Sequence, residues 1–522
     1  MRIFVLAAAL AVAASAASAQ PVTADHPLLR QLAAQVSAEQ QHATIEHLVG
    51  FGTRHTLSDT TSPTRGIGAA RRWVAAQFAA MSKECGGCLQ VETPSQMFTG
   101  RRIPKPTEVM DVLAIQRGTT DPDRVIVISG HLDSRVTDVM NATSDAPGAN
   151  DDASGVAAVM EAARVLSKHK FPATLVFAAL SGEEQGLDGG KVLADYAVAH
   201  GWRVEANLNN DIVGNTHGLN GVHDDTRVRV FSEGTKTVET KEEADRRRYN
   251  GGEVDSPSRE VARMMQGLAE HYLPGFKVTM VYRTDRFGRG GDQTQMLNAG
   301  FPAVRVTEAA ENYNRQHQDL RTENGIRYGD VIEGVDFAYL AKVTRLNVLT
   351  MAAMAMAPAP PTHVEISGGV SDHTTVKWAP VKDAAKIRLW WRDTTDPQWR
   401  HSRDVAPGAP AVLKNIIIDD WFFGVSALTA DGWESPVVFP GPAGSWAAHE
   451  APAKAPSSLG NASPGRLGAG EAPRSMHVVM HMVVAHVVVM MARMRLGGAD
   501  GQGEQRGGRD DDGGELHGGS PG

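Results

Sequence analysis

The segment that decides the fold runs from Arg124 to Ser134 and reads R-V-I-V-I-S-G-H-L-D-S. Its first six residues form a short run rich in β-branched side chains, which predicts a strand buried on both faces of a sheet. A histidine and an aspartate follow directly, at His131 and Asp133. Ligands of open α/β sheets collect at the carboxyl ends of the strands. The residues after this strand are therefore candidates for a functional site.

Helix and strand patterns alternate around this segment. They predict amphipathic helices over 69–81, 155–166 and 187–199, and buried strands over 174–180 and 204–212. We therefore expect an α/β fold, in which helices cover both faces of a mixed, mostly parallel sheet. The helical pattern ends near Met356, so we assign residues 20–356 to this domain.

The chain changes character at A-P-A-P-P, residues 357–361, which is typical of a stiff linker. Seven of the nine tryptophans lie at or beyond Trp378, within short alternating stretches. These stretches predict a small all-β sandwich over residues 362–450. The segment that begins at Trp421 resembles the late strands of a fibronectin type III domain, although a tyrosine normally stands where Trp421 does.

Residues 451–522 are rich in glycine, alanine, proline and serine, which predicts a disordered tail. Within it, residues 476–492 are apolar apart from three histidines. This stretch is slightly short for a membrane span. Two interpretations stay open for it, a C-terminal anchor and an accidental apolar tract, and we predict no stable membrane span.

Composition and the N-terminus narrow the class of protein. The chain has 522 residues, a formal charge of -8 and 42% hydrophobic residues, which excludes full disorder and offers no basic footprint for nucleic acid. Arg2, an apolar run and A-S-A at 17–19 predict a signal peptide over residues 1–19. We therefore expect a secreted or periplasmic protein. In that setting Cys85 and Cys88 favour a structural disulfide, since a zinc ribbon needs a second cysteine pair.

Five segments supply residue types that bind metals. They lie at 130–134 (G-H-L-D-S), 147–155 (P-G-A-N-D-D-A-S-G), 181–186 (S-G-E-E-Q-G), 209–211 (N-N-D) and 313–318 (Y-N-R-Q-H-Q). Taken singly, each has an ordinary structural explanation, such as a helix cap or a core histidine. Taken together, two imidazoles and three carboxylates suit a pair of zinc ions. One carboxylate must then bridge the ions, and an adjacent glutamate outside the ligand set suits a general base.

The combination of G-H-L-D-S, D-D-A-S-G and G-E-E-x-G-L resembles the secreted zinc aminopeptidases with co-catalytic metals, the family of bacterial leucyl aminopeptidase and glutamate carboxypeptidase. The resemblance covers about residues 26–350. It implies five zinc ligands: His131, Asp151, Glu184, Asp211 and His317. Asp151 would bridge the two ions and precede a cis peptide bond. Glu183 would be the general base, and Asp133 would support His131.

The same resemblance implies substrate contacts in two further stretches. One is R-G-G-D-Q at 289–293, with Asp292, near the substrate. The other is V-R-V-T-E at 304–308, with Arg305 and Glu308, which would contact the substrate or support the metal ligands from behind. An ordinary strand-end turn also stays open for this second stretch. The sequence departs from the family at Asn150, where an aspartate is common, and at Gln293, where a histidine is common. The first departure leaves the bridging position intact, and the second concerns the surroundings of the substrate.

The resemblance implies a secreted aminopeptidase with two Zn²⁺ cofactors. It would hydrolyse the first bond of peptides with a free N-terminus, using a metal-activated water and Glu183 as general base. A zinc carboxypeptidase is the first alternative, for which Arg286, Arg289 and Arg305 would offer basic groups. A glutaminyl cyclase of the same fold is the second alternative.

A third alternative is a non-catalytic binding or adhesion protein. In that case an exposed patch of Trp390, Trp391 and Trp399 on the β-sandwich would be the binding surface.

Overall fold

The computed structural model describes residues 24–408 and 410–447. The predicted signal peptide (1–19), the predicted tail (451–522) and the apolar tract 476–492 lie outside these residues. Among the helices of the described part, none is both long enough and apolar enough to cross a membrane.

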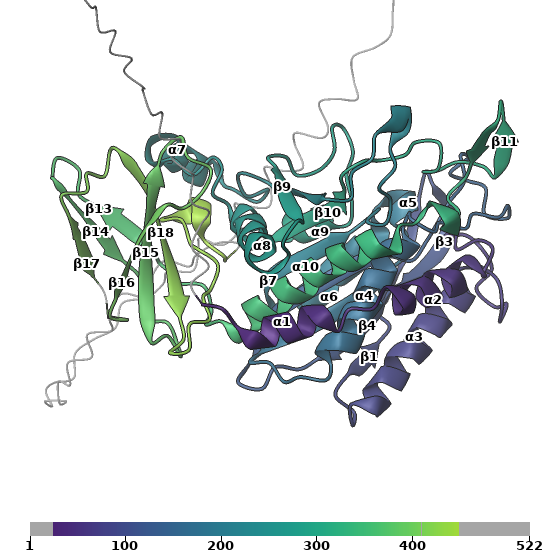
Figure 1. Cartoon of the computed structure of the whole chain (residues 1–522), viewed down its shortest axis with the longest axis horizontal. Helices are drawn as coiled ribbons and strands as arrows, with labels where there is room; N and C mark the ends of the chain where they lie inside the picture. Colours follow the sequence, from purple (N-terminus) through teal and green to yellow (C-terminus); the bar gives the residue numbers. More distant parts are fainter. Residues whose placement is uncertain (1–23, 409, 448–522) are drawn as a thin grey trace, which may run out of the picture. The chain divides into compact units, whose positions relative to one another are not determined.

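An eight-stranded mixed sheet forms the centre of the α/β part (Figure 1). Its order is β1 (Gln90–Glu92), β4 (Val112–Gln116), β6 (Ala173–Leu180), β5 (Asp121–His131), β7 (Arg203–Asn210), β10 (Ala303–Glu308), β8 (Arg227–Phe231) and β9 (Lys277–Val281). The four central strands, β6, β5, β7 and β10, are parallel. The mostly parallel α/β fold predicted from the sequence is confirmed.

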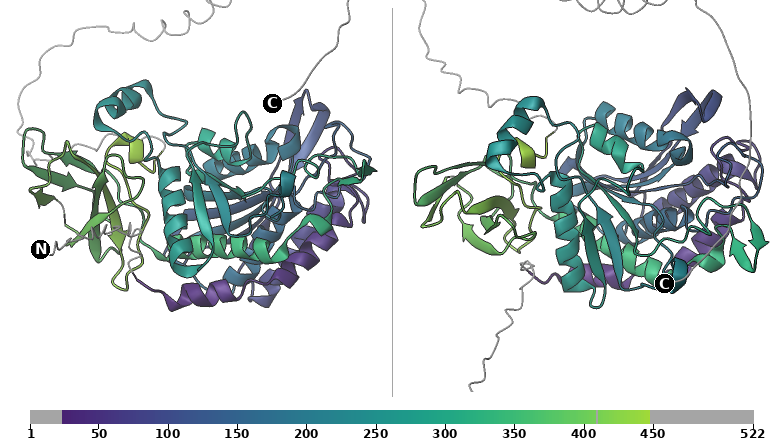
Figure 2. Two further views of the ribbon diagram at one scale, coloured as in Figure 1. Left: turned by 45° about the horizontal axis from the view of Figure 1, so that its top comes forward. Right: turned by 90° about the horizontal axis from the view of Figure 1, so that it is seen from above.

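Helices cover both faces of this sheet, as two further views show (Figure 2). One face carries α1 (Pro27–Ala34), α2 (Ala38–Val49), α3 (Gly66–Glu84), α4 (Ala153–Leu166), α8 (Pro257–Tyr272) and α10 (Phe337–Met356). The other face carries α6 (Asp188–Ala199) and α9 (Gln293–Asn298). Successive residues of β5 divide between the two cores, because side chains alternate along a strand. Ile126 and Ile128 pack into the first core, and Val125 and Val127 into the second.

Two glycines bring the start of α4 against the strand ends. A Cβ atom on Gly130 would lie 2.6 Å from the carbonyl carbon of Gly155. A Cβ atom on Gly155 would lie 2.3 Å from the carbonyl oxygen of Asn210, the last residue of β7. Backbones this close leave no room for a side chain. The loop before α4 is thereby held over the carboxyl ends of β5 and β7.

Smaller elements surround the sheet. They are the hairpin β2 (Ser95–Gly100) and β3 (Ile103–Met110), the hairpin β11 (Arg321–Glu323) and β12 (Ile326–Tyr328), the short helix α5 (Glu183–Gly186), and the exposed helix α7 (Lys241–Asn250). The turn of the first hairpin and the chain between β10 and β11 contribute to the site described below.

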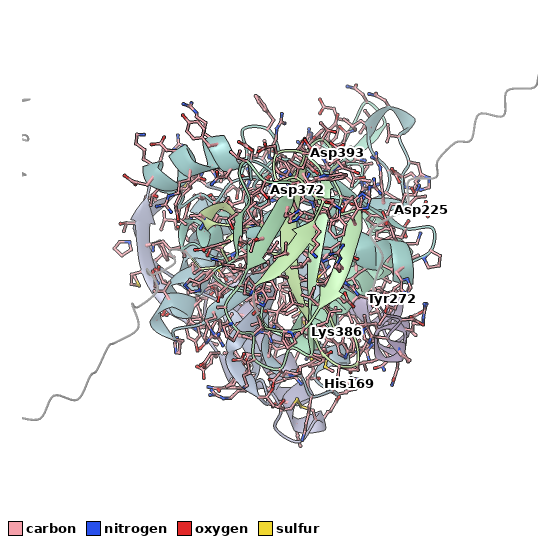
Figure 3. All side chains as sticks on the ribbon, turned by 90° about the vertical axis from the view of Figure 1, so that its left-hand side faces the viewer. His169, Asp225, Tyr272, Asp372, Lys386 and Asp393 are labelled. Carbon is pink, nitrogen blue, oxygen red and sulfur yellow. A yellow bond between two sulfur atoms is a disulfide. The ribbon has the colours of Figure 1, made fainter. Side chains whose placement is uncertain are left out.

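Residues after α10 form two antiparallel sheets of three strands each. One has the order β13 (Glu365–Ser367), β14 (His373–Lys377) and β17 (Ala411–Lys414). The other has the order β16 (His401–Val405), β15 (Lys386–Asp393) and β18 (Trp421–Leu428). Figure 3 labels the two ends of β15, Lys386 and Asp393. The small all-β region is thus present, and its relation to fibronectin type III domains stays a prediction.

The tryptophans of this region do not form the exposed patch that a binding protein would present. Trp390 and Trp399 are 0% exposed and pack together in one core cluster, while Trp391 is half-buried. The indole nitrogen of Trp390 donates to Ser426 (2.9 Å), and that of Trp399 donates to Glu260 on α8 (3.0 Å). Large aromatic rings with a satisfied N–H are typical of core residues.

Candidate metal centre

Three neighbouring strands deliver three of the predicted site segments to one edge of the sheet. His131 is the last residue of β5, and Asp211 directly follows β7. Glu183 and Glu184 open α5, which two residues separate from the end of β6. Because β6, β5 and β7 are parallel neighbours, their carboxyl ends lie side by side. The structure therefore brings these four side chains together.

The carboxylate of Asp151 lies between two histidines. Its Oδ1 atom is 3.1 Å from Nε2 of His131, and its Oδ2 atom is 3.0 Å from Nε2 of His317. Asp151 sits in the loop that precedes α4, and its peptide bond to Asp152 is cis. His317 comes from the chain between β10 and β11, at a positive φ of 54°. This is the arrangement that a carboxylate bridging two cations requires.

The side chains that could hold metal ions form two groups, and Asp151 belongs to one of them. His131, Glu183 and Asp211 make one group, and Asp151, Glu184 and His317 make the other. Within each group the nitrogen and oxygen atoms offered to an ion lie within 4.8 Å of one another.

The buried Nε2 of His131 and Oε1 of Glu184 make no hydrogen bond within the described chain. Yet each lies within 3.1 Å of another candidate ligand atom. Zinc prefers imidazole nitrogens and carboxylate oxygens as ligands, and here such atoms lie close together without a hydrogen bond between them.

Asp133 supports both sides of the centre. Its carboxylate accepts hydrogen bonds from the main-chain N–H groups of Glu183 (3.2 Å) and Glu184 (3.1 Å), which cap the short helix α5. The hydroxyl of Thr56 donates to the same carboxylate at 2.9 Å. The Nδ1 atom of His131 is 3.0 Å from the main-chain oxygen of Asp133 and 3.5 Å from its carboxylate. A held Nδ1 atom leaves Nε2 of His131 directed at the centre.

Two more buried carboxylates shape the loops. Asp152 accepts from the main-chain N–H of His131 (2.9 Å) and of Ile212 (3.2 Å), so it ties the ends of β5 and β7 together. Asp330 accepts from the main-chain N–H of Asp151 at 2.7 Å. Burial raises the pKa of Asp330 to about 7. Sequence reasoning missed Asp330, because it lies 179 residues from its partner and no motif contains it.

A cavity of about 290 Å³ lies over the centre. Its walls include Asp151, Glu183, Glu184, Asp211 and His317, together with four arginines: Arg102, Arg135, Arg286 and Arg289. Arg135 contacts two members of one ligand group, with Nε 2.8 Å from Oε2 of Glu184 and Nη2 2.6 Å from Nδ1 of His317. Sequence reasoning did not identify Arg102 or Arg135, since neither belongs to a recognised motif position.

The structure does not place the three predicted substrate contacts on this cavity. Asp292, Arg305 and Glu308 are each exposed by 1% or less, and none of them lines the cavity. The guanidinium of Arg305 instead lies 2.6 Å from Asp211 and 3.5 Å from Asp285. These positions indicate that Arg305 holds a candidate ligand in place from behind.

Electrostatics distinguish Glu183 from an ordinary carboxylate. Burial raises its pKa well above the usual range. His131 lowers the pKa, and the neighbouring carboxylates of Glu184 and Asp211 raise it further. A carboxyl group that holds a proton more firmly than usual is suited to proton transfer near neutral pH.

Comparison with known proteins agrees with this geometry. Residues 111–331 match Peptidase family M28. A probable zinc metalloprotease of Pyrenophora teres f. teres (strain 0-1) is 46% identical over 421 residues, which cover 80% of this chain and 87% of that protein. A second, from Leptosphaeria maculans, is 44% identical over 418 residues and covers 79% and 97% of the two chains.

Among solved structures, LapA of Legionella pneumophila is similar over 64% of this chain and 78% of the LapA chain, with a TM-score of 0.45 and 18% sequence identity. An aminopeptidase from Aneurinibacillus sp. strain AM-1 covers 63% of this chain and 96% of its own, with a TM-score of 0.43 at 15% identity. The family follows from the sequence relatives, which are similar over most of both chains. This chain belongs to Peptidase family M28.

Proposed function

We propose that this protein is a zinc aminopeptidase that hydrolyses the first peptide bond of substrates with a free N-terminus. The observation that carries the proposal is the Asp151 carboxylate, whose two oxygens face His131 and His317 at 3.1 and 3.0 Å. Such a carboxylate suits two Zn²⁺ ions, with His131 and Asp211 on one side and Glu184 and His317 on the other. The names of the relatives, probable zinc metalloproteases, support the choice of metal.

A pair of zinc ions supplies Lewis-acid polarisation of the scissile carbonyl and makes hydroxide available near neutral pH. The protein side chains supply the rest. The Glu183 carboxylate accepts the proton of the attacking water and later returns it to the leaving amine. Asp133 holds the amides of Glu183 and Glu184, so the base and a ligand keep a constant relative position.

The role of Glu183 is the sharpest point to test, because its carboxylate lies in one group with His131 and Asp211. The variant Glu183→Gln should lose about 10²- to 10⁴-fold in kcat while it retains two zinc ions per chain by atomic absorption. The neighbouring variant Glu184→Gln is the matched comparison and should lose zinc. If Glu183→Gln loses zinc or keeps its activity, Glu183 is not the general base.

The direction of cleavage needs a separate measurement. One peptide is compared with its N-acetylated form on the zinc-loaded protein, and products are identified by mass spectrometry. Stepwise loss of residues from the free N-terminus alone supports an aminopeptidase. Cleavage of both forms from the C-terminus contradicts it and supports the carboxypeptidase alternative.

We also propose that the protein is exported to a secreted or periplasmic location. The N-terminal sequence pattern supports this proposal, as does the disulfide between Cys85 and Cys88, because disulfides persist outside the reducing cytosol. We further propose a fibronectin type III-like relationship for the small sheets. Two three-stranded antiparallel sheets, β13-β14-β17 and β16-β15-β18, share one hydrophobic core, and this arrangement supports the proposal.

A further inference from the structure

We propose that the cavity over the metal centre selects a carboxylate of the substrate next to the scissile bond, so that an acidic residue is preferred to an apolar one. This inference rests on the proposed function and names the substrate class of the same site. It is carried by the side chains that line the cavity.

The cavity offers little to an apolar substrate side chain. Of the described residues that line it, Leu187 alone has an aliphatic side chain. Apart from acids and arginines, the remaining lining consists of Gly186, Gly290, Gln316 and the candidate ligand His317. Burying a leucine-sized side chain is favourable only where apolar surface receives it. A pocket with one aliphatic wall does not provide that surface.

The charged lining divides into two sets. All four acids of the lining, Asp151, Glu183, Glu184 and Asp211, belong to the predicted ligands and base. They are committed to zinc and to proton transfer. The four arginines are then the charged groups left in the lining to meet the substrate. They would repel a cationic side chain and attract an anionic one.

Two of these arginines have a carboxylate partner close by, and the positive charge of the other two is not balanced by a carboxylate of their own. Arg135 lies 2.8 Å from Glu184, and Arg286 lies 3.2 Å from Asp285. The nearest carboxylate to Arg289 is Glu311, at 3.5 Å. Glu311 is shared with Arg286 at 3.5 Å and is already paired with Arg229 at 2.6 Å. Arg289 therefore lacks a carboxylate of its own.

Arg102 pairs with no carboxylate in residues 24–408 and 410–447. Its Nη1 atom donates to the main-chain oxygen of Glu184 at 2.8 Å, which fixes the guanidinium beside the centre. Arg102 lies in the turn between β2 and β3, whereas Arg289 lies in the loop between β9 and α9. Two guanidiniums from separate segments thus line one cavity, and each has donors free for an anion. Arginine binds carboxylates through paired, charge-assisted hydrogen bonds.

The carboxylate has two sources. In an aminopeptidase substrate it belongs to the side chain of an aspartate or glutamate near the cleaved bond. In a carboxypeptidase substrate it is the terminal α-carboxylate. Three peptides with free N-termini and amidated C-termini, starting with Glu, Gln or Leu, test the first source. An N-acetylated peptide with a free C-terminus, compared with its amide, tests the second.

The variants Arg102→Gln and Arg289→Gln test the two guanidiniums. Each should lower kcat/KM for the preferred carboxylate substrate about ten- to a hundredfold relative to kcat/KM for the Gln peptide, so that the ratio of the two values falls. Arg101→Gln and Arg283→Gln are matched controls. Both residues are exposed and neither lines the cavity; Arg101 adjoins Arg102, and Arg283 lies in the same loop as Arg289. These controls should behave as the unchanged protein does.

Binding of glutarate, measured by calorimetry on the zinc-loaded full chain, gives a readout that does not depend on turnover. Affinity that falls about tenfold or more in Arg102→Gln and Arg289→Gln, but not in the controls, supports the inference. Equal affinity in all variants means that glutarate binds the metal alone and overturns it, as does a preference for the Leu peptide. Cleavage only at a free C-terminus supports carboxylate selection but refutes the aminopeptidase. If no peptide is cleaved but glutarate still binds in a way that depends on the two arginines, the proposed function is refuted and the carboxylate-binding site is supported.

Discussion

A buried ion network links helix α8 of the α/β part to strand β15 of the small sheets. Asp255 is 0% exposed and accepts from Arg263 on α8 (2.9 Å) and from Arg392 on β15 (2.6 Å). Arg263 also pairs with Glu260, and both arginines are 1% exposed. The negative charges of two carboxylates therefore balance the positive charges of two guanidiniums in a region without solvent. The network predicts that the small sheets contribute to the stability of the α/β part.

The variant Asp255→Asn keeps the shape of the side chain but leaves one buried positive charge without balance. Removing one partner from a buried ion pair typically costs about 3–5 kcal/mol, because the remaining charge is desolvated and has no opposite charge beside it. A typical protein has about 5–15 kcal/mol of stability in total. We therefore expect the free energy of unfolding to fall by about 3–5 kcal/mol.

Urea denaturation of the full chain, followed by far-UV circular dichroism, measures this change. The matched control is Asp245→Asn, which breaks the ion pair with Lys241 on α7, where the side chains are 62% and 79% exposed. Such pairs contribute little in water, so this variant should change stability by less than about 1 kcal/mol. If Asp255→Asn costs no more than this control, the network does not stabilise the protein and the reasoning is refuted.

Two further predictions follow from single carboxylates. Asp133→Asn removes the charge that holds the amides of α5 and the Nδ1 side of His131. Zinc affinity should therefore fall about 10–100-fold, as is usual when such supporting groups are lost. Competition with a fluorescent chelator measures this affinity, and an unchanged value would contradict the supporting role. Burial raises the pKa of Glu233 to about 7 from an ordinary 4.5, although hydrogen bonds from Thr237 oppose the shift. The folded protein thus holds this proton more tightly than the unfolded chain, so stability is fully present below about pH 4.5 and declines by up to about 3 kcal/mol as the pH rises through 7. Glu233→Gln should remove this decline in pH-dependent thermal melts, and an unaltered slope would contradict the prediction.

Local pattern was enough to determine the central strands and the identity of the candidate ligands. The apolar run at 124–129 forms the middle of β5, the run at 174–180 lies within β6, and the helix predicted over 155–166 is α4 (Ala153–Leu166). The predicted third strand, 204–212, ends earlier, at Asn210. Strand and helix periodicity depends on neighbours in sequence, so it can be recognised without any knowledge of the fold.

The surroundings of the ligands depended on contacts between distant parts of the chain. Asp330, Arg102 and Arg135 carry no motif, and they reach the centre only because the folded loops place them there. Arg305 belonged to a recognised stretch, yet the fold turns its guanidinium toward Asp211 and away from the cavity.

The sequence by itself therefore determined which side chains are present to bind metal and at which strand ends they stand. Only the tertiary structure decided that the Asp151 carboxylate faces both histidines and that arginines surround the remaining space. The reason is physical. The chemistry of a ligand belongs to its residue type, whereas distances, burial and the charge of a cavity arise from segments that meet only on folding.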